Sequence, residues 1–140
     1  MKLTARIFGW LTAGVLLMAS PALAHHSFAM FERDRQVVLN GVVRELRWTN
    51  PHAWLELDVP NGKGEVRWSL ELNSPSNLTR QGWKSDQLKP GDKVTVVVNP
   101  LRSGEHGGLF LQARMHDGRI VSDQFVISPS HPIREPGSPE

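Results

Sequence analysis

The chain has 140 residues, with 16 Lys and Arg, 14 Asp and Glu, and no cysteine. The lack of cysteine excludes disulfides, thiolate metal sites and cysteine nucleophiles. A formal net charge of +2 is far from the strongly basic balance of nucleic-acid-binding proteins, so we do not expect nucleic acid as a partner.

Residues 1–24 have the pattern of a secretory signal peptide. Lys2 and Arg6 supply the positive start, residues 7–18 supply the apolar stretch, and small residues lead up to Ala24. The apolar stretch is shorter than the roughly 20 residues that a membrane-spanning helix needs. We therefore predict cleavage after Ala24, a periplasmic or secreted protein, and no membrane insertion after cleavage.

Cleavage would also change the charge of the protein. It removes two basic residues, Lys2 and Arg6, and no acidic residue, which leaves 14 basic and 14 acidic residues. A neutral chain of this kind gives no indication of a basic patch for a membrane surface.

Three further segments follow the predicted signal. Residues 25–36 are mostly polar and form an N-terminal arm, in which Phe28, Met30 and Phe31 are expected to lean on the core. Residues 37–127 form the folded domain. Residues 128–140 contain four prolines and few apolar side chains, which predicts a disordered tail.

The folded domain contains five strand-like runs with alternating apolar residues. Gly41 interrupts the first run and suggests a bulge or a sharp coil there. In the last run, strict alternation places Leu109, Leu111, Ala113 and Met115 on one face. The runs are residues 37–49, 52–59, 65–72, 93–100 and 108–115, and a short sixth strand is possible within 117–127.

One short helix is indicated between the third and fourth strands. Ser74 is a suitable N-cap, Pro75 suits the first helical position, and Gly82 followed by Trp83 suits the end. Three strands, a helix and two strands are the order of an OB-type barrel, a small five-stranded Greek-key barrel. The predicted fold is thus all-β with one short helix, an OB-type five-stranded barrel, with a small β-sandwich as the alternative.

Several motifs resemble a family of small secreted bacterial proteins that is catalogued as a domain of unknown function. The resemblance covers about residues 25–120. It implies a secreted, single-domain β protein and brings no activity or site residues with it. The motifs that carry it are "HHSFAMF", "NPHAW", "LELNSP" and "LKPGDKV".

A metal site is the first functional hypothesis. Cleavage after Ala24 would give His25 both a free α-amine and an imidazole, and these two nitrogens together chelate a metal. One more imidazole would complete a three-nitrogen site suited to copper, and His52 at the start of the second strand is the favoured source. His26 or the thioether of Met30 would assist.

The outer face of the second and third strands is the second hypothesis. Trp54 and Glu56 point outward from the second strand, and Arg67 and Glu71 point outward from the third. This face commonly binds ligands in OB folds. It would hold a small polar ligand or a periplasmic protein partner, although the arm is also expected to fold over Trp54.

Catalysis is the least favoured class. The sequence contains no G-x-S-x-G, P-loop or H-E-x-x-H pattern, and no nucleophile with a matching base can be named. We therefore predict no catalytic residues. The two remaining hypotheses are copper binding and ligand binding without turnover.

Overall fold

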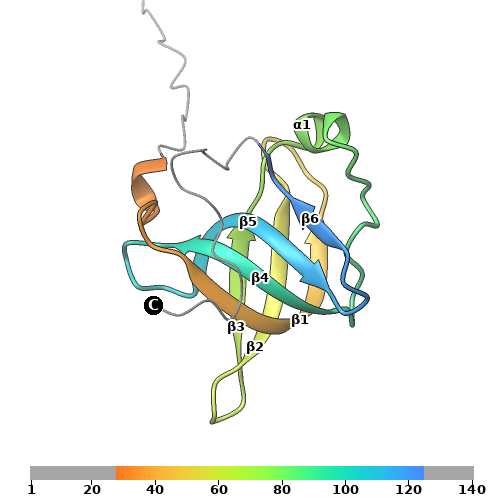
Figure 1. The fold of residues 1–140 in the computed structure, drawn as a ribbon. Helices are drawn as coiled ribbons and strands as arrows, with labels where there is room; N and C mark the ends of the chain where they lie inside the picture. The colour runs from red at the N-terminus through yellow and green to blue at the C-terminus, as the bar shows by residue number, and fades with distance from the viewer. Residues whose placement is uncertain (1–27, 125–140) are drawn as a thin grey trace, which may run out of the picture.

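The computed structural model describes residues 28–124 (Figure 1), and both the predicted signal peptide and the predicted tail lie outside them. None of the helices in this described part is long and apolar enough to span a membrane. In chain order the elements are η1 (Phe28–Met30), β1 (Val37–Arg47), β2 (Trp54–Pro60), β3 (Glu65–Glu71), α1 (Pro75–Arg80), β4 (Lys93–Pro100), β5 (Gly107–Met115) and β6 (Ile120–Ser122).

Five of the strands close into a barrel. The sheet order is β3-β2-β1-β4-β5-β6, and an additional parallel pairing between β3 and β5 joins the two sides. The other pairings are antiparallel, and β6 extends the sheet from β5. Figure 1 shows α1 at one end of this barrel. The expected OB-type barrel is therefore confirmed, and the alternative β-sandwich is not adopted.

β1 is coiled and pairs with strands on both sides of the barrel. Its first half, to Val42, pairs with β4, and the second half, from Val42, pairs with β2. Gly41 lies just before this change, where a Cβ atom would be only 2.8 Å from the Asp58 carbonyl oxygen. The close approach explains the glycine, while the bulge itself falls later, between Val43 and Glu45.

The alternation predicted for β5 is wrong in its first half. Val97 of β4 pairs with Gln112, but the next residue, Val98, pairs with Phe110, so Leu111 forms a bulge. Phe110 consequently points into the main core. Leu109 and Leu111 instead join a second apolar cluster on the outer face of the sheet.

The helix forms as its sequence signals predict. The Ser74 side chain accepts a hydrogen bond from the Asn77 backbone nitrogen at 3.3 Å. At the other end, Gly82 has φ +89°, and the Trp83 backbone nitrogen donates to the Leu78 carbonyl oxygen at 3.0 Å. This is a Schellman ending. It turns the chain so that Trp83 is buried edge-on against Phe110, with 5.6 Å between the ring centres.

The arm is anchored by one side chain rather than by its whole apolar stretch. Phe31 is 3% exposed and packs in the outer cluster, whereas Phe28 and Met30 remain 47% and 43% exposed. The backbone nitrogen and the Nε of Arg102 donate to the carbonyl oxygens of Met30 and Ala29, each at 2.9 Å. The described part of the arm, from Phe28 onward, thus lies against the β4–β5 loop.

The chain beyond β6 is fastened to the helix end of the barrel. Asp123 is fully buried, and its carboxylate accepts hydrogen bonds from the Asn73 backbone nitrogen at 2.8 Å and from Gln81 Nε2 at 3.2 Å. Trp83 Nε1 donates to the Ser122 carbonyl oxygen at 3.0 Å. These contacts join segments of the chain that are distant in sequence.

Candidate functional site

A cavity of about 240 Å³ lies where the arm, the β4–β5 loop and the ends of β2 and β3 meet. Figure 1 shows η1 beside the loop that connects β4 and β5. Among the described residues, the lining consists of Met30, Phe31, Trp54, Ser69, Glu71, Leu101, Glu105, His106, Gly107 and Gly108. The β2–β3 face and the β4–β5 loop are where OB folds commonly bind their ligands.

The register of the hairpin places Trp54 and Glu71 side by side. They are direct partners across the antiparallel β2–β3 pair, and the next residues on the same face, Glu56 and Ser69, are partners as well. Leu55 and Leu70 point the other way and are fully buried. Alternation along the two strands therefore brings an indole and a carboxylate to one edge of the cavity.

Two glycines at the start of β5 complete this wall. A Cβ atom on Gly107 would lie 2.6 Å from Leu101 Cδ1, and one on Gly108 would lie 2.7 Å from the Asn99 carbonyl oxygen. The pairing of Ser69 with Gly107 and of Leu70 with Gly108 closes the barrel here. Any larger residue at Gly107 would push the Leu101 side chain, which also lines the cavity.

Glu71 is a carboxylate with little exposure. It is only 4% exposed, and its Oε1 lies 3.2 Å from Nδ1 of His52. The same Nδ1 is 3.0 Å from the Leu72 carbonyl oxygen. Because a carbonyl oxygen only accepts, the hydrogen bond to Leu72 requires that Nδ1 carries a hydrogen. His52 thus stands next to Glu71 without lining the cavity itself.

The other two residues of the predicted ligand face lie outside the cavity lining. Glu56 accepts from Arg47 at 2.7 Å and from the Ser69 hydroxyl at 2.8 Å, so its carboxylate is already paired. Arg67 is exposed and lies 3.8 Å from Asp58. The structure brings together Trp54 and Glu71 of the four predicted residues.

The predicted copper ligands are only partly within the described residues. His25 and His26 lie outside them. Met30 lines the cavity, and His52 neighbours it through Glu71. Within residues 28–124, no group of three or more His, Cys, Asp or Glu side chains is arranged to hold a metal ion.

Glu105 and His106 also line the cavity, and both lie outside the two predicted sites. They end the β4–β5 loop, and the His106 ring packs edge-on against Trp68 with 5.4 Å between ring centres. Ser103 donates to the Glu105 carboxylate at 3.0 Å. Their place in the site could have been inferred from the fold topology, because the β4–β5 loop of an OB barrel borders its ligand face.

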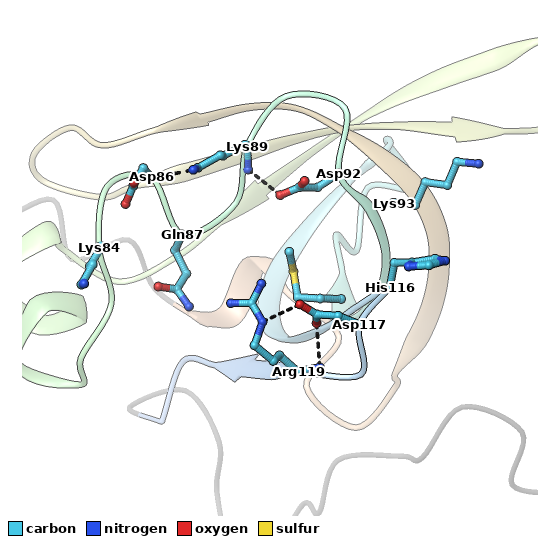
Figure 2. A pocket seen from close by; sticks show the side chains of 10 residues that line it. Lys84, Asp86, Gln87, Lys89, Asp92, Lys93, His116, Asp117 and Arg119 are labelled. Carbon is cyan, nitrogen blue, oxygen red and sulfur yellow. Dashed lines mark hydrogen bonds and ion pairs between the residues drawn. The ribbon is translucent and has the colours of Figure 1, made fainter.

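A larger cavity, of about 570 Å³, lies between residues 84–93 and the β5–β6 turn. Figure 2 shows two ion pairs among its charged side chains: Lys89 with Asp86 at 3.9 Å, and Arg119 with Asp117 at 2.7 Å. The hydrogen bonds from Arg119 hold the pKa of the Asp117 carboxyl below its ordinary value. Most of the charged side chains that line this cavity are exposed to solvent, so we place the candidate site at the smaller one.

Comparison with known proteins identifies a family, but it does not identify an activity. A family model described as "Family of unknown function (DUF6152)" matches residues 13–112. No curated protein and no solved structure matches the chain.

Proposed function

The chain belongs to the DUF6152 family, which carries no known activity, and we propose from the residues of the site that it is a ligand-binding module without turnover. In this proposal the protein works in the periplasm or outside the cell, after removal of the predicted signal. It holds a small polar ligand in the cavity beside Trp54 and Glu71.

The observation that supports this proposal is the composition and place of the cavity. It lies on the β2–β3 face and is bounded by the β4–β5 loop, as OB-type binding sites are. An aromatic ring beside a buried carboxylate combines apolar contact with a polar group that fixes orientation. Gly107 and Gly108 at the base let Leu101 and the Asn99 backbone pack closely against this wall of the cavity.

Ligand binding is tested by nuclear magnetic resonance on the ¹⁵N-labelled mature chain, residues 25–140, with a panel of small cationic, neutral and anionic compounds. We expect the signals of the Trp54 indole and of the Gly107 and Gly108 amides to shift. Trp54→Leu should weaken binding by about threefold to tenfold, since one aromatic contact contributes roughly 0.5–1.5 kcal/mol. Shifts confined to the cavity around Lys89 and Arg119 would contradict the proposal.

A specific observation also favours copper binding as a second candidate. Met30, from the arm, lines the same cavity as Glu71, and the Glu71 carboxylate lies beside His52. A carboxylate or carbonyl partner on one ring nitrogen is the usual support of a histidine that ligates metal through the other. Only two residues of sequence separate His25 from Phe28, where η1 begins. In this alternative, His25 supplies an amine and an imidazole, His52 supplies a second imidazole, and His26 or Met30 assists.

The copper alternative makes a prediction that depends on the amino terminus. Cu(II) should bind the chain that begins at His25 at least tenfold more tightly than the same chain with one extra N-terminal glycine, because the extension removes the α-amine from His25. His52→Ala should weaken binding similarly, whereas His116→Ala, in the exposed β5–β6 turn, serves as the matched control. Isothermal titration calorimetry measures all four proteins. Equal affinity with and without the extra glycine would exclude this site.

A further inference from the structure

The Glu71 carboxylate is the group in the cavity for which an ionic or hydrogen-bonding partner is expected. A carboxylate that is buried without compensation costs several kcal/mol of folding free energy, so such groups are paired or hydrogen-bonded. Glu71 is 4% exposed, yet no described residue donates it a well-aligned hydrogen bond. Its polar neighbour is Nδ1 of His52 at 3.2 Å, and that N–H is directed to the Leu72 carbonyl oxygen.

The uncompensated part of this carboxylate faces the cavity. In the described part of the chain, each fully enclosed side-chain polar atom has a hydrogen-bond partner. A Glu71 oxygen that lacks a donor must therefore border open space, and the space next to Glu71 is the cavity that it lines. A ligand that enters the cavity therefore meets a carboxylate whose described polar neighbour is the His52 ring.

The described residues that line the cavity offer this carboxylate no lysine or arginine partner. Glu105 adds a second carboxylate to the lining. The nearby guanidinium groups are engaged elsewhere, because Arg47 pairs with Glu56 at 2.7 Å and Arg102 donates to the Ala29 carbonyl oxygen. None of the described residues that line the cavity is a lysine or an arginine.

The remaining walls suit a cation with an apolar body. Phe31 and Leu101 provide apolar contact, and Met30 provides a polarisable thioether. The Trp54 ring adds an aromatic wall. The volume of about 240 Å³ is below that of sites for drug-sized molecules, which indicates a compact ligand.

We propose that this cavity binds a protonated primary amine, with the ammonium group donating to the Glu71 carboxylate and the alkyl body lying between Trp54, Phe31 and Leu101. The inference rests on the proposed ligand-binding function and names its ligand class. A free alkylamine and the side chain of a lysine on another protein present the same chemistry, so the experiment includes both.

The experiment titrates the mature chain, residues 25–140, with n-butylammonium, its neutral analogue n-butanol, and Nα-acetyl-lysine amide, followed by nuclear magnetic resonance. We expect n-butylammonium to bind at least tenfold more tightly than n-butanol, with shifts at Trp54 and Gly107. Tighter binding of the lysine amide would identify a protein partner as the source, and equal or weaker binding would identify a free amine. Both results support the amine class.

Glu71→Gln keeps the shape and removes the charge, so it should weaken n-butylammonium binding by about tenfold or more, since a hydrogen bond to a charged group contributes roughly 1.5–3 kcal/mol. Glu65→Gln, on the exposed far end of β3, is the matched control and should change nothing. Gly107→Ala, which pushes Leu101 into the cavity, provides a second variant that keeps the carboxylate, and it should also weaken binding.

The failures of the two proposals are distinguishable. If n-butanol binds at the cavity as tightly as n-butylammonium, or if Glu71→Gln binds the amine unchanged, the amine class is wrong while the ligand-binding site stands. If neither the amines nor the wider panel of probes shifts Trp54 and Gly107, the ligand-binding function itself is wrong.

Discussion

Replacing Phe110 with alanine is expected to lower the free energy of unfolding by about 3–5 kcal/mol, as large-to-small changes of buried aromatic residues do. The Phe110 side chain is fully buried and contacts Trp83 edge-on. Uninterrupted alternation along β5 would have put this ring on the outer face, together with Gln112. The bulge at Leu111 reverses that assignment.

Urea denaturation followed by tryptophan fluorescence measures this loss. Phe28→Ala is the matched control, because the same residue type is 47% exposed there and its removal should change the stability by less than about 1 kcal/mol. If the two substitutions had equal effects, the bulge at Leu111 would be wrong and the simple alternation of β5 would be restored.

Asp123→Ala is expected to cost about 2–4 kcal/mol of stability. The substitution removes the carboxylate that accepts hydrogen bonds from the Asn73 backbone nitrogen and from Gln81 Nε2. Both donors would then lose this acceptor. It also loosens the segment that positions the Ser122 carbonyl oxygen for Trp83. The loss of these contacts should therefore separate the end of β6 from α1 before the barrel itself unfolds.

The comparison with Asp117→Ala isolates the effect of burial. Asp117 is exposed and, among the described residues, bonds to the nearby Arg119, so its removal should leave stability nearly unchanged. Hydrogen exchange of the amides in α1 and β6 supplies the local readout, with faster exchange expected in Asp123→Ala alone. Unchanged exchange and unchanged stability in Asp123→Ala would show that the carboxylate is not a structural link.

Elements set by local patterns could be predicted from the sequence. The outward position of Trp54 and Glu71 follows from a period of two in a hairpin with a short turn. The helix ends follow from Ser74 and Gly82, whose cap geometries involve only neighbouring residues. The order of strands and helix was then enough to identify the OB-type barrel.

Features set by contacts between distant segments could not be predicted in this way. The bulge at Leu111 arises from the register with β4, and alternation within β5 carries no sign of it. Phe31 anchors the arm because it packs into an apolar cluster on β4 and β5. The sequence of the arm alone does not distinguish Phe31 from Phe28 and Met30 as the buried residue. The cavity joins four segments of the chain, so its combination of Glu71 with Glu105 emerges only in three dimensions.

The parallel pairing of β3 with β5 has a consequence for synthesis of the chain on the ribosome. β5 is the shared neighbour of β3, β4 and β6, and it is among the last elements to be made. A nascent chain that ends before Gly107 can form the β1–β2–β3 meander, but β3 keeps an open edge. Folding must then wait for non-local contacts that close slowly. A ribosome stalled before β5 would thus expose a strand able to pair with other chains, and release of the finished chain removes that hazard.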